Sequence, residues 1–277
     1  MKGDANISAV ASLLSDPTRC RVLLALADGR TLSASALAAE AGVAPSTASE
    51  HLGKLLDADL LTVEVRGRHR YYRLTGPRVA RLLETLAQHA PLEPIRSLRE
   101  GTRAHALRQA RFCYDHLAGR LAVALMDTLL DRGVLIGPDA KADPEAGEPG
   151  RPSTGTGLLG EYRLGPGGAR WMREFGIELD AIQSHRRPLI RHCFDWSEQR
   201  HHLAGALGQS LAQRLFALGW LVPGRQARVV AITDAGIAEL EAQLGIRLDT
   251  PDQQRRGARA WTRTATPHQA DELRASG

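Results

Sequence analysis

The chain has 277 residues and a formal net charge of +5, and this length is enough for two domains. The sequence pI is about 9.5, which permits nucleic-acid binding without requiring it. The sequence contains no apolar run of about 18 residues, so we expect no membrane-spanning helix. The N-terminus has no apolar signal region, and three cysteines do not make a disulfide framework. We therefore expect a protein of the reducing cytoplasm.

A helix-turn-helix pattern is predicted from Asp16 to Leu56. A short helix that Ser33 or Ser35 can cap ends at Gly42. A second helix begins at Pro45, a residue type that suits the first helical turn. A helix, a short turn with glycine and a second helix are typical of this DNA-binding motif. The apolar face of the second helix consists of Leu52, Leu55 and Leu56, at helical spacing.

Two strands joined by an arginine-rich turn follow the second helix. Residues 61–65 alternate apolar and polar side chains, and residues 71–74 return. Six arginines and no acidic residue occur from Arg66 to Arg81, and such a run neutralises phosphates and releases counterions. Short polar side chains at the start of the second helix can reach base edges in a major groove. The predicted DNA-binding residues are Pro45, Ser46, Thr47, Ser49, Glu50 and Lys54 on the helix, with Arg66, Arg68, His69 and Arg70 at the turn.

These motifs together resemble the ArsR/SmtB family of winged-helix repressors, roughly over residues 8–90. The matching segments are Asp-Pro-Thr-Arg at 16–19, Ser-Thr-Ala-Ser-Glu-His-Leu at 46–52 and Arg-Tyr-Tyr-Arg-Leu at 70–74. The resemblance implies a winged helix-turn-helix domain, which we place at residues 1–94. It also implies a homodimer on double-stranded DNA, with one helix of each subunit in a major groove. The helix after the wing, here residues 75–90, builds the dimer interface in the family.

The best-known metal sites of the family are not matched in this sequence. The helix at residues 34–41 lacks a Cys-x-Cys pair, and the helix after the wing offers only His89. We interpret Cys20 as a core residue and His51 as a side chain that packs or orients the second helix. Any effector is therefore expected to bind in the C-terminal half.

The C-terminal half contains an internal repeat. Residues 116–135 match residues 202–221 at an offset of 86 without a gap. Each copy predicts a helix, two strands and a further helix, so we expect two winged-helix-like repeats. Neither copy has the Ser/Thr-rich start or the arginine turn, so both should pack and bind rather than read bases. The predicted fold class is α+β, mostly helical, with this repeat domain after the winged helix-turn-helix.

The segments around the repeats complete the predicted organisation. A basic connecting helix at residues 95–111 opens the second domain, which extends over residues 95–249. Residues 137–160 are rich in Gly, Pro, Ser and Thr and predict a long flexible loop. Residues 250–277 are polar and arginine-rich, and we predict a disordered tail.

A Cys-aromatic-Asp segment occurs twice, at residues 113–115 and 193–195. Thiolate and imidazole are ligands for zinc and its soft relatives, and Cys113 and His116 could share a helical face at i, i+3 spacing. We favour the alternative that both cysteines are small buried hydrophobes. A redox pair is a third hypothesis, which needs Cα atoms within about 7 Å. The candidate ligands for Zn, As or Cd are Cys113, His116, His192 and Cys193.

Large aromatic side chains are concentrated in the C-terminal half. Trp171, Phe194 and Trp196 are candidates for an apolar pocket that binds a small organic effector, and the alternative is an ordinary core. The leading hypothesis is a dimeric, sequence-specific DNA-binding regulator, a repressor released by an effector. We find no phosphate loop, nucleophile elbow or His-Glu-x-x-His motif and expect no enzyme. The other hypotheses are a small-molecule-binding protein or enzyme with a vestigial helix-turn-helix, and a DNA-organising protein without an effector.

Overall fold

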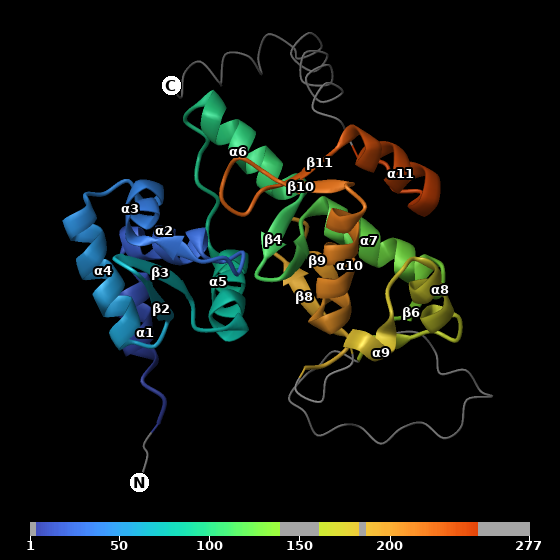
Figure 1. Ribbon diagram of the computed structural model, residues 1–277, viewed down its shortest axis with the longest axis horizontal. Helices are drawn as coiled ribbons and strands as arrows, with labels where there is room; N and C mark the ends of the chain where they lie inside the picture. The colour runs from blue at the N-terminus through green and yellow to red at the C-terminus, as the bar shows by residue number, and fades with distance from the viewer. Residues whose placement is uncertain (1–3, 139–160, 183–186, 249–277) are drawn as a thin grey trace, which may run out of the picture. The chain divides into compact units, whose positions relative to one another are not determined.

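The computed structural model describes residues 4–138, 161–182 and 187–248 (Figure 1). The predicted loop at 137–160 lies outside these residues from 139 onward, and the predicted tail at 250–277 lies outside them entirely. The elements considered below all belong to one unit, Met1–Ile246. Across the described ranges, none of the helices combines the length and apolar character needed to cross a bilayer.

The N-terminal elements form the predicted winged helix-turn-helix. Asp16 caps α2 by accepting a hydrogen bond from the backbone N–H of Arg19 at 2.9 Å, and Gly42 ends α3 in the left-handed conformation at φ 70°. The elements are α1 (Ile7–Leu14), α2 (Pro17–Ala25), β1 (Leu32–Ser33), α3 (Ala34–Ala41), α4 (Pro45–Asp57), β2 (Leu61–Arg66) and β3 (His69–Leu74), with sheet order β1-β3-β2.

The leucines that the sequence places on the inner helix faces build the N-terminal core. Leu23, Leu26, Leu37 and Leu55 are fully buried, and Leu52 is 1% exposed. Burying each of these side chains stabilises the fold by about 2 kcal/mol. This core fixes α4 against α2 and α3 and leaves the opposite face of α4 in solvent.

Two helices connect the wing to the rest of the chain. α5 (Pro77–His89) buries Val79, Leu83 and also the charged Glu84. α6 (Leu98–Gln109) lies inside the predicted range 95–111 and is capped by Ser97, which accepts from the backbone N–H of Glu100. A buried carboxylate on α5 needs a partner, and the C-terminal elements supply it, as described below.

The C-terminal elements run twice through one order: a hairpin, a long helix, a short hairpin and a helix. The first set is β4 (Arg111–Cys113), β5 (His116–Ala118), α7 (Arg120–Asp131), β6 (Leu135–Ile136), β7 (Arg163–Leu164) and α8 (Gly168–Glu174). The second set is β8 (Arg191–Asp195), β9 (Arg200–Ala204), α10 (Gly205–Ala217), β10 (Leu221–Pro223), β11 (Val230–Ile232) and α11 (Asp234–Leu244), with the short α9 (Leu179–Ile182) between the sets.

Each set begins with a hairpin, β4–β5 in the first and β8–β9 in the second, and we call these two the leading hairpins. Sequence analysis did not predict either of them. Cys113 and His116 do not share a helical face, because the chain reverses between them at Tyr114, which has φ 62°. The two residues are instead direct cross-strand partners on β4 and β5. The long helices then pack crosswise: α7 contacts β5 and β9, and α10 contacts the same two strands (Figure 1). The two hairpins are therefore held together in one core.

Substitution of Gly119, which lies between the first leading hairpin and α7, tests this packing. Gly119 has φ +87°, and a Cβ there would lie 2.6 Å from the carbonyl oxygen of Arg108. We expect Gly119→Ala to lower the free energy of unfolding by about 2–4 kcal/mol through strain and overpacking. Gly42 also has positive φ but has open space around it, so Gly42→Ala should cost only about 1 kcal/mol. Equal losses for the two variants in urea unfolding would contradict this interpretation.

Candidate functional site

The start of α4 presents a polar surface to solvent, and a buried alanine packs its other side against the core. Ala48 is fully buried, and it fixes the first turns of the helix so that Ser46, Thr47 and Ser49 are exposed. The hydroxyl of Ser49 donates to the carbonyl of Pro45 at 2.9 Å. No side chain caps the first turn of α4, so its N–H groups remain available to an anion.

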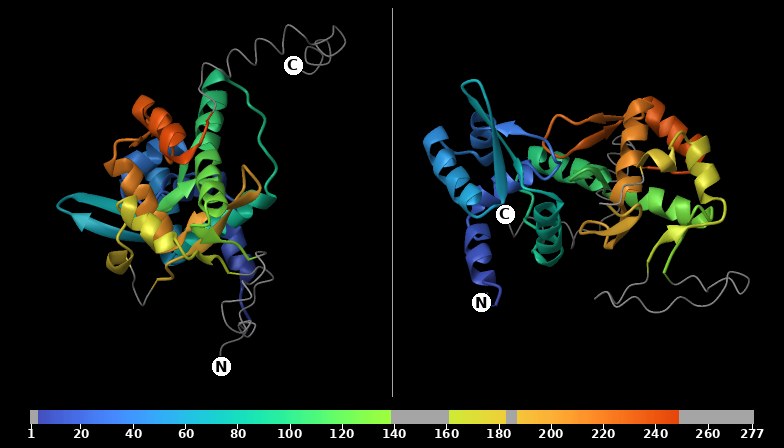
Figure 2. Two further views of the ribbon diagram at one scale, coloured as in Figure 1. Left: turned by 90° about the vertical axis from the view of Figure 1, so that its right-hand side faces the viewer. Right: turned by 60° about the horizontal axis from the view of Figure 1, so that its bottom comes forward.

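The tip of the β2–β3 hairpin is the second part of this surface and is exposed throughout (Figure 2). Arg66 pairs with Glu64 at 2.9 Å and lies 5.4 Å from the centre of the Tyr71 ring. Among the described residues, no ion pair involves Arg68 or Arg70. These two guanidinium groups are therefore the hairpin charges best placed to bind an external anion.

Helix and hairpin tip meet in one groove. A hollow of about 450 Å³ is lined by Pro45 and Ser49 of α4 together with Arg68, His69 and Arg70 of the hairpin. The predicted helix and turn residues are thus brought to one face, while Glu50 and Lys54 form an ion pair at 2.6 Å farther along α4. A polar helix start beside a basic tip is the arrangement that contacts bases and phosphates of a duplex.

His51 holds the buried side of α4. Its Nδ1 lies 3.8 Å from the carboxylate of Asp16, the residue that caps α2. The backbone N–H of Arg19 lowers the pKa of Asp16, so the carboxylate is charged near neutral pH. This position fits the predicted packing and orienting role.

A second candidate site is the Cys-His cluster, formed by Cys113, His116, Cys193 and His202. One ligand atom from each residue lies within 4.8 Å of the other three, and the two Sγ atoms are 3.9 Å apart. Each leading hairpin supplies one cross-strand pair, Cys113 with His116 and Cys193 with His202. Thiolate and imidazole in this combination can hold a zinc-class cation.

The structure changes one member of the predicted ligand set. Cys113, His116 and Cys193 come together as predicted, but the ring of His192 lies 4.6 Å from that of His201 and 5.5 Å from that of Tyr162. The reason is that successive side chains on a strand point to opposite faces. His202 takes its place. The sequence carried a signal for it, because the internal repeat, whose copies are offset by 86 residues, aligns His202 with His116.

Each histidine of the Cys-His cluster has a carboxylate beside its Nδ1 atom. For His116 the partner is Asp115 at 3.2 Å, and for His202 it is Asp195 at 3.5 Å. The Nε2 atoms of both rings are buried without a hydrogen-bond partner, and Nδ1 of His202 also makes no hydrogen bond. Burial lowers the pKa of His202 well below its usual value, so its imidazole is neutral at pH 7.

Behind the Cys-His cluster lies a buried ion network centred on Arg111. Its guanidinium is fully buried, 3.1 Å from Asp195 and 3.4 Å from Glu84 of α5, and the ring of Trp196 covers it at 4.8 Å. Burial favours the protonated form of Asp195, but Arg111 and the backbone N–H of Gly119 outweigh it and lower the pKa to about 2. Arg228 also pairs with Glu84. The network therefore ties α5 to both leading hairpins.

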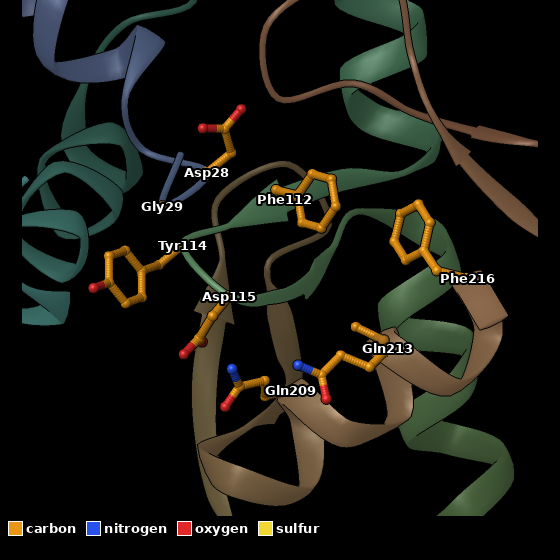
Figure 3. A pocket seen from close by; sticks show the side chains of 9 residues that line it. Asp28, Gly29, Phe112, Tyr114, Asp115, Gln209, Gln213 and Phe216 are labelled. Carbon is orange, nitrogen blue, oxygen red and sulfur yellow. The ribbon is translucent and has the colours of Figure 1, made fainter. Parts of the chain in front are cut away.

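The predicted aromatic pocket is not assembled. Trp171 stacks on Phe175 at 5.0 Å, Trp196 covers Arg111, and Phe194 lines a separate hollow of about 270 Å³. These rings fill different parts of the fold because they lie on different elements and partner with different neighbours. Figure 3 shows another hollow of about 550 Å³, where Phe112 and Phe216 stack at 5.3 Å beside Gln209 and Gln213.

Known proteins similar to this chain share its helix-turn-helix. Residues 14–64 match the family described as a helix-turn-helix domain. The uncharacterized HTH-type transcriptional regulator YdfF of Bacillus subtilis (strain 168) is 38% identical over 243 residues, covering 88% of this chain and 99% of that protein. The HTH-type transcriptional regulator CmtR of Mycobacterium tuberculosis (strain ATCC 25618 / H37Rv) is 42% identical over 84 residues, covering 29% of this chain and 70% of CmtR.

Solved structures are similar to about a third of this chain. The homodimeric winged helix-turn-helix DNA-binding domain Mb0332 (fragment 1–100) from Mycobacterium bovis is 27% identical, with a TM-score of 0.27, and covers 34% of this chain and 100% of that one. The transcriptional repressor BigR from Xylella fastidiosa is 24% identical, with a TM-score of 0.29, and covers 31% of this chain and 88% of that one.

The buried ion network predicts a strong asymmetry between two arginine substitutions. Arg111→Met leaves Glu84 and Asp195 without their shared partner, so we expect a loss of about 3–5 kcal/mol in the free energy of unfolding. Arg200 makes an exposed pair with Asp127 at 2.6 Å, and Arg200→Met should cost no more than about 1 kcal/mol. Urea unfolding followed by circular dichroism measures both. A loss for Arg111→Met as small as that for Arg200→Met would show that the network contributes little.

Proposed function

We propose, from the premise that the chain belongs to the HTH-type transcriptional regulators, that it is an ArsR/SmtB-like repressor. In this proposal the repressor is dimeric and sequence-specific, and an effector bound in its C-terminal half releases it from DNA. The observation that carries the DNA-binding part is the groove shared by α4 and the β2–β3 hairpin. Exposed short polar side chains at the helix start would read bases, and Arg68 and Arg70 would bind phosphates. The relatives named above are HTH-type transcriptional regulators.

The dimer is proposed to form through α5 together with α1. Leu86 on α5 is 45% exposed, and Ile7 on α1 is 77% exposed. Exposed apolar side chains on helices next to the winged helix-turn-helix are suited to a two-fold interface. In such a dimer the two α4 helices would enter successive major grooves, roughly 34 Å apart.

We propose that α5 transmits the effect of effector binding to the winged helix-turn-helix domain. Glu84 of α5 is paired with Arg111 of β4 and with Arg228. The backbone N–H of Tyr114 also donates to the carbonyl of Ala27 in the turn after α2 at 2.6 Å. An effector that favours one packing of the leading hairpins would therefore favour one position of α5. Such an effector releases DNA when the two α4 helices no longer match successive grooves.

We interpret the two C-terminal sets of elements as two copies of one helix-and-wing half-module. The shared order of elements and the aligned segments 116–135 and 202–221 support this interpretation. A small organic effector remains the alternative to a soft metal ion. The hollow beside Phe112 and Phe216 is where such a molecule would bind, because it combines stacked rings with amide side chains (Figure 3).

Substitutions in the two parts of the groove should affect DNA binding differently. Arg68→Ala with Arg70→Ala should weaken binding to all duplexes and reduce the slope of log affinity against log salt by about 2, because two phosphate contacts are lost. Ser46→Ala and Thr47→Ala should change the preferred sequence and leave the salt slope intact. Footprinting upstream of the chain's own gene supplies the operator for these titrations.

The matched control is Arg173→Ala, which removes an exposed arginine from α8 and should leave both quantities unchanged. Identical effects of the helix and hairpin substitutions on sequence preference would contradict the assignment of roles. Absence of any sequence preference in the unmodified chain would exclude the proposed function and favour a DNA-organising protein.

The dimer proposal makes a separate prediction. Leu86→Glu places a charge on the exposed apolar face of α5, and burying that charge at an interface is costly. We expect this variant to be monomeric at micromolar concentration by light scattering, where the unmodified chain is a dimer. Val222→Glu changes a side chain on β10 that is similarly exposed, at 42%, and should stay dimeric. A Leu86→Glu variant that remains a dimer would place the interface elsewhere.

A further inference from the structure

We propose that the Cys-His cluster is a closed site for one zinc-class divalent cation. The four ligands are Cys113, His116, Cys193 and His202. The site is argued from its own geometry, whereas its role as the effector site rests on the proposed function. Four protein ligands leave no open position for water, and closed sites of this composition hold cations for structural rather than catalytic purposes.

Distances within the cluster fit a tetrahedral cation. A Zn–S bond of about 2.3 Å gives a separation of about 3.8 Å between two sulfurs of one tetrahedron, and the two Sγ atoms are 3.9 Å apart. A disulfide requires about 2.05 Å, so the sulfurs are spaced for a shared ligand rather than for a bond. The limit of 4.8 Å over all four ligand atoms requires only small side-chain rotations for binding.

The orientation of the two histidines is an independent observation that points to a cation. Metal-ligating histidines usually present one ring nitrogen to the ion and the other to a carboxylate or carbonyl. Here Asp115 and Asp195 lie beside the Nδ1 atoms, and the Nε2 atoms have no partner. His202 is fully buried and His116 is 7% exposed, and no protein group satisfies either Nε2 atom. We therefore assign Nε2 of each ring as the ligand atom.

The charge and softness of the ligands select the class of cation. Two thiolates neutralise a divalent ion, which reduces the cost of burying it beside the Arg111 network. Thiolate and imidazole together suit Zn²⁺, whereas Mg²⁺ and Ca²⁺ require oxygen ligands. A tetrahedral arrangement of two sulfurs and two nitrogens is characteristic of zinc.

A route for the cation reaches the cluster beside α5. A hollow of about 280 Å³ is lined by Cys113, His116 and Cys193, and also by Ala80 and Arg81 of α5. A solvated cation can therefore meet three of the four ligands from the surface. His202 closes the site from the core side, where Leu203 and Ala204 are buried next to it on β9.

Occupancy of the site would act on α5 through one carboxylate. Asp195 lies beside His202 and also pairs with Arg111, which in turn pairs with Glu84 of α5. Drawing His202 toward a cation changes the 3.5 Å separation between its Nδ1 atom and the carboxylate of Asp195, and therefore the electrostatic surroundings of Asp195. These three contacts connect the proposed effector site to α5, the helix that we propose forms the dimer interface.

The test is titration of the reduced, metal-free, full-length chain with Co²⁺. One Co²⁺ per chain should bind, with the visible absorption of a tetrahedral ion and sulfur-to-cobalt charge transfer, and Zn²⁺ should displace it. Cys193→Ser and His202→Ala should lose more than about 100-fold in affinity, since they remove ligands, and Asp115→Asn should lose about 10–100-fold. Serine nearly matches cysteine in size, so the Cys193→Ser variant keeps the packing of the strand.

Two matched controls make the result decisive. Cys20 lies outside the cluster and donates its Sγ–H to the carbonyl of Leu14, and His192 is the strand neighbour of Cys193 on the other face. Cys20→Ser and His192→Ala should therefore bind Co²⁺ as the unmodified chain does. Dependence on His192 rather than His202 would overturn the ligand assignment. Absence of charge-transfer absorption at micromolar Co²⁺ would overturn the cation site. A Cys113–Cys193 disulfide formed when that chain is then treated with oxidised glutathione, which accepts the two electrons, would favour a redox pair.

DNA titrations separate this proposal from the proposed function. If Zn²⁺ lowers operator affinity in the unmodified chain and not in Cys193→Ser, the cation is the effector. If Co²⁺ binds with the expected spectrum but operator affinity does not change, the site stands and its effector role is overturned. If the metal-free chain and the loaded chain both bind duplexes without sequence preference, the proposed function fails while the cation site remains.

Discussion

The C-terminal half of this fold depends on the pairing of the buried Arg111 guanidinium with two carboxylates. A charge without access to water must be matched by opposite charges and hydrogen bonds, because desolvation otherwise costs more than the fold can supply. Arg111 finds Glu84 on α5 and Asp195 on β8, and these two carboxylates come from separate parts of the chain. Moving either element away would remove one of the two carboxylates that neutralise the buried Arg111. The position of α5 is therefore set by electrostatic pairing as well as by the apolar contacts of Val79 and Leu83.

Asp195 joins this network to the Cys-His cluster. One of its oxygens accepts from the backbone N–H of Gly119 at 2.6 Å and lies 3.5 Å from His202, and the other lies 3.1 Å from Arg111. The carboxylate is charged at neutral pH because Arg111 and its hydrogen bonds lower its pKa to about 2. A single side chain thus orients a proposed ligand, closes the turn before α7 and neutralises Arg111. This shared use makes the proposed cation site and α5 parts of one packed unit.

The elements that local signals specify were predictable, and those that depend on long-range pairing were not. Pro45, Gly42 and the leucines at 52, 55 and 56 determine α3 and α4 through capping and helical periodicity, so the winged helix-turn-helix followed from the sequence. Strands β4 and β5 have three residues each, too few to show alternation. Arg111 belonged to the predicted basic connecting helix at residues 95–111. Only its pairing with Glu84 and Asp195, which lie far from it in the sequence, explains its burial. The repeat pointed to His202 by aligning it with His116, but the strand faces were needed to exclude His192.

The two leading hairpins explain why a binding site could arise in the C-terminal half at all. Each hairpin offers one thiol and one imidazole at paired positions, and two ligands are too few to hold a zinc-class cation tightly. The crosswise packing of α7 and α10 brings the two pairs together. A cation bound there would depend on the relation between the hairpins more than on either hairpin alone. Glu84 of α5 pairs with Arg111 of one hairpin, and Arg111 pairs with Asp195 of the other. A change in the packing of the two hairpins would therefore change the position of α5. Coupling of this kind needs no contact between the cation and the DNA-binding surface, only two packings of the hairpins that differ in their affinity for the ion.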